Sequence, residues 1–190
     1  MTRKICISVI GSGSHEGDLD EEVLGIAKEV GREIALRGAV LVCGGLGGVM
    51  LAAAKGAKDG GGITVGLVPG ENPDSANPYI DISLPTGLGH ARNVLVAYSG
   101  DAVIAISGSL GTLSEISFAL MKEKPIIGIG TWDLNELAHQ RYSDKISSGQ
   151  QYQCPKDYGK SVIQCTNAKE AVSKAFMLIR DKSLLFNSES

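Results

Sequence analysis

Positive charge is scarce in this sequence, and so are long hydrophobic runs. Its 190 residues include 18 Lys and Arg against 21 Asp and Glu, for a formal net charge of −3. Binding of DNA or RNA depends on clustered cations that neutralise phosphates, so no nucleic-acid partner is expected. No apolar run approaches the roughly 20 residues that a membrane-spanning helix needs, so no membrane partner is expected either. The first residues lack the apolar block of a signal peptide, and we expect a cytoplasmic protein.

Metal-site patterns are missing as well. The four cysteines are scattered, without any Cys-x-x-Cys pair; they are Cys6, Cys43, Cys154 and Cys165. Zinc sites and redox dithiols need paired cysteines at short spacing. We therefore predict no metal site and no resident cofactor.

What the sequence does contain is a regular alternation of short β-branched runs and longer stretches with helical spacing of apolar residues. This alternation predicts an α/β fold with a mostly parallel sheet of about six to seven strands, covered by helices. A single domain over residues 1–190 is expected because this length suits one core. The predicted strands are Ile5–Ile10, Ala39–Cys43, Ile63–Val68, Tyr79–Leu84, Ala102–Ile106, Ile126–Ile129 and Ser161–Cys165.

Helices are expected between these strands. The first should start near the capping residues Asp18 and Asp20 and end at Gly38. Further helices are predicted over Val49–Lys58, around His90–Tyr98, over Thr112–Lys122, and after Thr166 or Asn167. Residues 133–160 lose the periodicity, and we expect a surface loop or lid there.

The glycine-rich turn after the first predicted strand does not match a dinucleotide-binding fingerprint. That fingerprint is Gly-x-Gly-x-x-Gly, and in GSGSHEG the third glycine, Gly17, falls one residue too late. An acidic residue is also expected after the second strand, where the sequence has Gly44 and Gly45. NAD binding is therefore disfavoured. Gly11 and Ser12 form either a tight turn or part of a ligand loop, and the second glycine loop leaves the same two alternatives open.

The third glycine turn, SGSLGT, is the best candidate for an anion site. It spans Ser107 to Thr112 between a predicted strand and a predicted helix, where unpaired N–H groups and the helix dipole favour phosphate. It is not a Walker loop, because no Lys-Ser/Thr follows the last glycine. The alternative is that Ser109 or Thr112 only caps the helix, with Glu115 closing a capping box with Thr112.

A second element lies upstream of this turn. Arg92 precedes Glu115 by 23 residues, in the sequence His90-Ala91-Arg92-Asn93. On a helix that leads into the same strand, Arg92 could reach the crevice above the third glycine turn. Trp132 follows the sixth predicted strand, where packing is a commoner role for tryptophan than base stacking.

Together these residues resemble the Lonely Guy family of cytokinin-activating phosphoribohydrolases, long mislabelled as lysine decarboxylases. The family pattern PGGxGTxxE corresponds to SGSLGTLSE at residues 107–115, preceded by the Arg92 segment. The resemblance covers roughly residues 4–132 and includes CGGLGGVM. It implies a Rossmann-like three-layer domain that forms a homodimer. It also implies hydrolysis of a nucleoside 5′-monophosphate to a base and ribose 5-phosphate.

By this resemblance Arg92 and Glu115 would be catalytic, because glycosidic cleavage passes through an oxocarbenium-like state that a carboxylate stabilises. Arg92 offers donors to ribose or phosphate oxygens. The residues expected to bind phosphate or nucleotide are Gly11, Ser12, Gly44, Gly45, Asn93, Ser107, Gly108, Ser109, Gly111 and Thr112.

Three positions depart from the family pattern. Ser107 replaces its proline, Ser109 replaces its second glycine, and Asn93 replaces the lysine of its Arg-Lys pair. These features resemble a short branch that includes molybdenum-cofactor carrier proteins, which bind a phosphorylated pterin. The alternative function is therefore non-catalytic binding of a phosphorylated ligand. Lysine decarboxylation is disfavoured because no lysine lies in the glycine turns to hold pyridoxal phosphate.

Two predicted helices also suggest self-association. The segment Val94 to Tyr98 and the later helix with Ile116, Phe118 and Leu120 carry apolar residues on more than one face. Apolar residues on a second face suit burial against another subunit.

Overall fold

The computed structural model describes residues 3–13, 19–132, 134 and 162–187. Within them, strands form one sheet in which each neighbouring pair is parallel, in the order β4-β3-β2-β1-β5-β6-β7. The strands are β1 Cys6–Gly11, β2 Val40–Cys43, β3 Ile63–Val68, β4 Ile82–Pro85, β5 Ala102–Ile106, β6 Ile126–Ile129 and β7 Ile163–Gln164.

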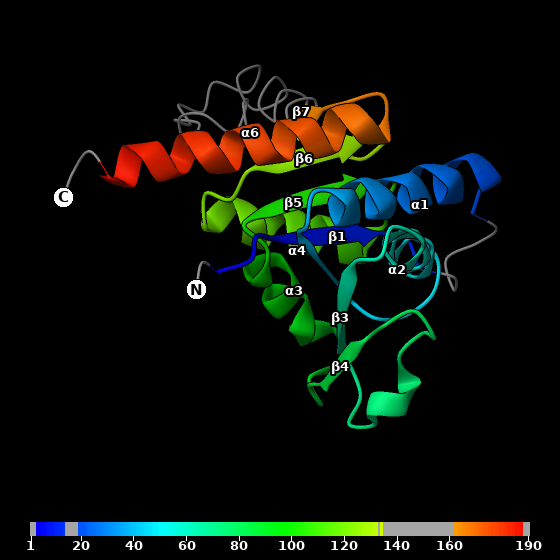
Figure 1. Ribbon diagram of the computed structural model, residues 1–190. Helices are drawn as coiled ribbons and strands as arrows, with labels where there is room; N and C mark the ends of the chain where they lie inside the picture. Colours follow the sequence, from blue (N-terminus) through cyan, green and yellow to red (C-terminus); the bar gives the residue numbers. More distant parts are fainter. Residues whose placement is uncertain (1–2, 14–18, 133, 135–161, 188–190) are drawn as a thin grey trace, which may run out of the picture.

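Helices cover both faces of this sheet (Figure 1). They are α1 Glu21–Leu36, α2 Val49–Asp59, α3 Asn93–Ser99, α4 Leu110–Met121 and α6 Ala168–Asn187, with short 3₁₀ turns η1 Pro73–Ser75 and η2 Gly89–Arg92. Helices α1, α2 and α6 share one apolar core on one face, and α3 and α4 share another on the opposite face. The predicted three-layer Rossmann-like fold is confirmed.

The central strands are buried on both sides. Every residue of β5 and of β6 is buried, as expected for parallel strands with helices on both faces. Their sequences, AVIAI and IIGI, are continuous apolar runs, which is why the predicted bounds match the observed ones. The described residues contain no helix that is both long and apolar enough to cross a membrane.

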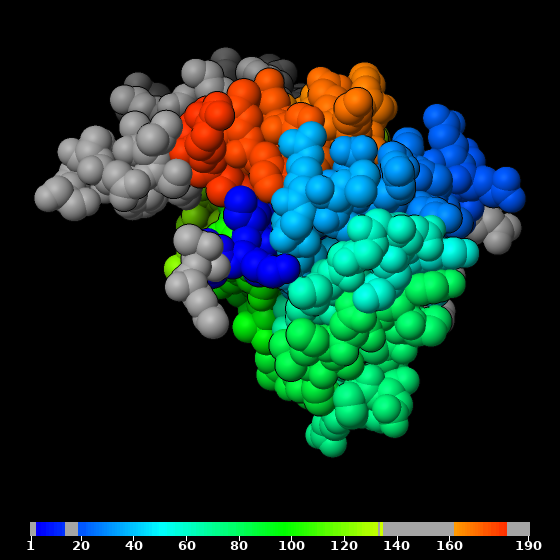
Figure 2. Space-filling model, viewed as in Figure 1, coloured from blue at the N-terminus to red at the C-terminus, as the bar shows by residue number. Residues whose placement is uncertain are grey.

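Two predicted elements begin more than two residues away from the observed ones. The strand expected at Tyr79–Leu84 is β4, which begins only at Ile82, because the preceding Asp81 is held by side-chain contacts. Its carboxylate accepts hydrogen bonds from the backbone N–H of Thr64 at 2.9 Å and from Lys58 Nζ at 2.6 Å. Figure 2 shows the region around β4 and η1 as a projection from the body of the molecule.

The helix expected around His90–Tyr98 is divided. Its start is the 3₁₀ turn η2, and the α-helix begins only at Asn93. The expected loop or lid at residues 133–160 lies outside the described residues except for Leu134. Of the expected caps of the first helix, Asp20 accepts a hydrogen bond from the Glu22 N–H at 3.0 Å, and Asp18 lies outside the described residues.

The topology places the glycine loops at the carboxyl ends of the strands. The chain runs from β1 outward to β4 on one side, and β5 then pairs with β1 on the other, with Gly11 opposite Ile106. Ligands of such sheets bind beyond the carboxyl ends of the strands, where the strand order reverses. The loops that follow β1, β2, β5 and β6 all lie at this end of the sheet.

Candidate functional site

The third glycine turn leads from β5 directly into α4. Ser109 is the N-cap residue of the helix, and its N–H donates to Thr112 Oγ1 at 3.4 Å. The first N–H groups of a helix have no partner within it and carry the positive end of the dipole. The turn therefore has the backbone geometry that suits a phosphate, as the sequence indicated.

The backbone of this turn has two unusual residues. Ser107 has a φ of 54° and Gly108 a φ of 139°. A Cβ at Gly108 would also lie 2.8 Å from two carbons of the Thr112 side chain. Non-glycine residues rarely adopt positive φ, and such strain gathers at functional sites. The N–H of Ser107 donates to the carbonyl of Ile129 at 3.0 Å, which ties the turn to the end of β6.

The capping-box alternative for Glu115 is wrong. The side chain that returns to the N-cap backbone is that of Thr112, three residues after Ser109. Glu115 instead faces Arg92, with Oε1 3.5 Å from Nη1. Helix α4 presents Glu115 toward α3, and the turn η2 delivers Arg92 to the same place.

Arg92 and Glu115 form a buried ion pair. Each residue is only 6% exposed. Burial raises the pKa of Glu115 to about 7, although the Arg92 charge opposes the shift. The Nε of Arg92 is buried and has no hydrogen-bond partner among the described residues. Perturbed pKa values and buried polar atoms without partners are features that gather at functional sites, and this pair has both.

The second glycine loop makes room for this guanidinium. A Cβ at Gly44 would overlap both Nη atoms of Arg92, so the absence of a side chain lets the two groups touch. Gly45 has a φ of 74°, and its carbonyl accepts hydrogen bonds from the backbone and side chain of Asn77. Sequence reasoning missed Asn77, because the contact joins segments about thirty residues apart and no local pattern marks it.

Asn93 joins the two helices of the site. It is buried, and its Nδ2 donates to Ser114 Oγ at 2.9 Å and to the carbonyl of Gly111 at 3.4 Å. Asn93 was predicted to bind phosphate or nucleotide, and its amide nitrogen is engaged within the protein. It fixes the start of α3 against the first turn of α4, next to the candidate phosphate position.

Gly11 and Ser12 also lie at the carboxyl ends of the strands, but their contacts support the turn that follows β1. A Cβ at Gly11 would overlap the carbonyl oxygen of Ile106 and approach Val49 Cγ1 to 2.7 Å. The carbonyl of Ser12 accepts the Val49 N–H at 3.0 Å. These contacts match the tight-turn alternative, because they hold the first residue of α2 against the turn.

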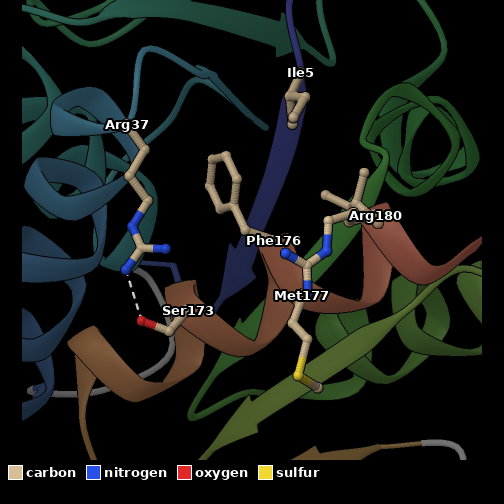
Figure 3. Close-up of a pocket in the computed structure, with 7 residues that line it drawn as sticks. Ile5, Arg37, Ser173, Phe176, Met177 and Arg180 are labelled. Atoms are coloured by element: carbon tan, nitrogen blue, oxygen red, sulfur yellow. Dashed lines mark hydrogen bonds between the residues drawn. The ribbon is translucent and has the colours of Figure 1, made fainter. Parts of the chain in front are cut away.

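Two cavities differ in position. One, of about 250 Å³, borders the third glycine turn and is lined by Ser107, Gly108, Gly130, Thr131 and Trp132. The other, of about 670 Å³, lies where the strands begin, and is lined by Ile5, Arg37, Ser173, Phe176, Met177, Ile179 and Arg180 (Figure 3). There Arg37 donates to Ser173 at 2.6 Å and stacks over Phe176, contacts that hold α6 against α1. Only the first cavity adjoins the glycine loops.

No group of three or more potential metal-ligating side chains occurs in the part of the chain that the structure describes. The candidate site is thus a glycine turn at the N-terminus of α4, a buried Arg–Glu pair and a small cavity, set at the carboxyl ends of the strands of a Rossmann-like sheet. The chain belongs to the SLOG cluster4 family, whose profile matches residues 4–172.

Solved structures and a curated relative extend this assignment. The molybdenum cofactor binding protein of Rippkaea orientalis is 34% identical, with a TM-score of 0.72 over 95% of this chain and 98% of that one. The molybdenum cofactor carrier protein of Chlamydomonas reinhardtii is 31% identical, with a TM-score of 0.72 over 94% and 99%. A cytokinin riboside 5′-monophosphate phosphoribohydrolase of Mycobacterium tuberculosis is 35% identical over 58% of this chain and 64% of its own length. The predicted relation to the Lonely Guy family is confirmed.

Proposed function

We propose that this protein is a carrier that binds a phosphorylated pterin of the molybdenum-cofactor type, with the phosphate at the amino end of α4. The similarity to carrier proteins extends over nearly the whole of both chains, whereas the similarity to the phosphoribohydrolase covers 58% of this chain. The sequence pattern placed hydrolysis first and binding second, and this proposal reverses that order.

The observation that carries the proposal is the conformation of Ser107. Its φ of 54° is one that proline cannot adopt, because the pyrrolidine ring holds φ near −65°. The turn of the hydrolase pattern begins with proline, so its backbone cannot follow the same path at this position. Ser109 adds a side chain where the hydrolase pattern has glycine. Both differences alter the surface that meets the ligand's phosphate.

A phosphoribohydrolase is the second candidate, and the Arg92–Glu115 pair favours it. The two side chains lie 3.5 Å apart and are buried next to the phosphate turn. With a pKa of about 7, Glu115 is partly ionised at neutral pH, and its carboxylate could stabilise the positive charge that develops on a ribose ring. Arg92 would bind ribose or phosphate oxygens.

The two functions are separated by assaying turnover and binding together. Release of ribose 5-phosphate is measured for a panel of nucleoside monophosphates, beside the melting temperature with and without neopterin monophosphate. A carrier gives no release and a raised melting temperature. A hydrolase releases ribose 5-phosphate, and Glu115→Gln abolishes the release, while Glu21→Gln on the exposed start of α1 leaves it intact.

We also propose that the protein forms homodimers through α3 and α4. Glu115 is the only charged residue in either helix, and it is buried. The outer surface instead exposes Leu95, Leu110 and Met121, the last two about three-quarters exposed. Surface helices are ordinarily rich in charge on their solvent side, so an uncharged face suits contact with a second subunit.

A further inference from the structure

The small cavity beside the phosphate turn has a lining suited to a flat ring. Two of its five residues follow β5, namely Ser107 and Gly108, and three follow β6, namely Gly130, Thr131 and Trp132. None carries a charge. Its volume of about 250 Å³ is below the roughly 300–1,000 Å³ of pockets that enclose whole ligands. The cavity therefore suits one uncharged part of a ligand.

The indole of Trp132 is held in place at this cavity. Its Nε1 donates to the carbonyl of Ser109, the N-cap residue of α4, at 3.3 Å. The ring is partly buried against the apolar core beneath α3 and α4. An aromatic face fixed in advance costs little further entropy when a ligand stacks on it. The same hydrogen bond sets the indole next to the position expected for phosphate.

The rest of the lining leaves room for a ligand and includes a polar group without a partner. Gly130 has a φ of 56°, and a Cβ there would meet nothing within 4 Å, so the wall is open at this point. Thr131 has a buried hydroxyl oxygen without a hydrogen-bond partner among the described residues. Buried polar atoms without partners are rare in proteins and call for an explanation, such as a role in binding. A heterocycle with polar edges matches this lining better than an aliphatic chain does.

The cavity lies on the far side of the turn from the Arg–Glu pair. The guanidinium of Arg92 touches Gly44 at the end of β2, whereas Gly130 follows β6. Three strand spacings separate β2 from β6 in the sheet order, or roughly 14 Å. A ring beside β6 is therefore remote from the guanidinium of Arg92, which suits retention of the ligand without cleavage.

We propose that this cavity is the ring subsite, in which the planar heterocycle of the phosphorylated ligand stacks on Trp132 while its phosphate occupies the amino end of α4. The inference rests on the proposed carrier function and names the residue that selects the ligand's ring. Trp132 is thus a specificity residue, in addition to the packing role that its position in the sequence suggested and that its contact with the core confirms.

The test uses the fluorescence of the protein itself. Trp132 is the only tryptophan in the chain, so all tryptophan emission comes from this side chain. The protein is titrated with neopterin monophosphate and, separately, with ribose 5-phosphate, which has the phosphate but no heterocycle. Calorimetry gives each affinity independently, and free N-acetyltryptophanamide corrects for light absorbed by the pterin. Saturable quenching by neopterin monophosphate alone, at the affinity found by calorimetry, is the expected result.

Variants separate stacking from support of the turn. Trp132→Leu should weaken neopterin monophosphate about tenfold, within the range of stacking on aromatic side chains, and leave ribose 5-phosphate unchanged. Trp132→Phe keeps a flat ring without the N–H and should restore most of the affinity. The control Phe176→Leu removes a partly buried aromatic ring of α6 that lines the other cavity, and this variant should bind both probes as the parent does.

Each other outcome overturns the inference in a recognisable way. Binding of neopterin monophosphate without a change in emission means that the ring lies elsewhere, although the proposed carrier function survives. If Trp132→Leu and Trp132→Phe lose affinity for both probes equally, Trp132 only supports Ser109 through its hydrogen bond. If calorimetry detects binding of neither probe, the proposed function fails, and the ring subsite fails with it.

Discussion

The backbone of Gly44 lies against the guanidinium of Arg92, so closely that a Cβ at position 44 would overlap both Nη atoms. This contact joins the end of β2 to the turn that precedes α3, and it holds Arg92 where Nη1 meets Glu115. The second glycine loop therefore acts on the site through a side chain of another segment.

Gly44→Ala should destabilise the protein by about 1–3 kcal/mol, because the added methyl group overpacks a buried position and displaces Arg92 from Glu115. Urea unfolding measures the change. The control is Gly25→Ala, at an exposed position in the middle of α1 where a Cβ meets nothing within 4 Å. That substitution should stabilise by up to about 1 kcal/mol, since alanine favours helix more than glycine does. Equal stability of Gly44→Ala and the parent would mean that the Arg92 side chain moves aside without cost.

The stability of the protein should fall as pH rises through the range set by Glu115. Burial raises the pKa of this carboxyl from 4.5 to about 7 in the folded state, so between these values the folded state binds more protons than the unfolded state. The free energy of unfolding then decreases with rising pH, by on the order of 3 kcal/mol in total. Urea unfolding at pH 5 and pH 8 measures this slope.

The Glu115→Gln variant isolates the contribution of this group, since glutamine does not titrate. Its free energy of unfolding should change less between pH 5 and pH 8 than that of the parent, because all other titrating groups are the same in both. An identical pH dependence in the two proteins would mean that the folded-state pKa of Glu115 is unshifted.

Gly108→Ala should abolish most phosphate binding. The residue has a φ of 139°, and a Cβ would crowd Thr112 at the start of α4, so the turn must change shape. Gly38→Ala provides the matched control, because Gly38 also has a positive φ, of 72°, but has nothing within 4 Å and lies at the end of α1. Each variant should lose roughly 1–2 kcal/mol of stability. Calorimetry with ribose 5-phosphate should show at least about tenfold weaker binding for Gly108→Ala alone.

Met121→Lys should convert the proposed dimer to a monomer. Met121 is 74% exposed in the last turn of α4, where a lysine favours the helix dipole, so the variant should fold normally. Leu36→Lys is the control, because Leu36 is 57% exposed in the last turn of α1, on the opposite face of the sheet. Analytical ultracentrifugation reports the mass of each. If the parent protein sediments as a monomer, the face formed by α3 and α4 is not a dimer interface.

Sequence patterns predicted the central strands well and the edge of the sheet poorly. Strands β3, β5 and β6 have the predicted bounds. For β5 and β6 the reason is that helices cover them on both faces, so they are apolar throughout. Strand β4 lies at the edge, where Ile82 and Leu84 remain nearly half exposed, so its apolar residues do not mark its limits. The split of the predicted 90–98 helix into η2 and α3 likewise has no signal in apolar spacing.

For the site, local pattern and resemblance were enough to name Arg92, Glu115 and the turn from Ser107 to Thr112. They were not enough to choose between a capping role for Glu115 and a role in the crevice with Arg92, because both satisfy the same spacing. The choice depends on which group faces the carboxylate, and that group comes from a segment 23 residues away. The contact of Asn77 with the second glycine loop and that of Trp132 with Ser109 were unforeseen for the same reason.

The sequence by itself determined the alternation of strands and helices, the apolar core and the position of a glycine turn at a helix N-terminus, since each follows from the chemistry of consecutive residues. Tertiary structure alone decided that Gly44 supports Arg92, that Asn93 joins α3 to α4, and that Trp132 contacts Ser109 in that turn. Those relationships join residues far apart in the chain, and only the packing of several strand ends at one edge brings them within contact distance.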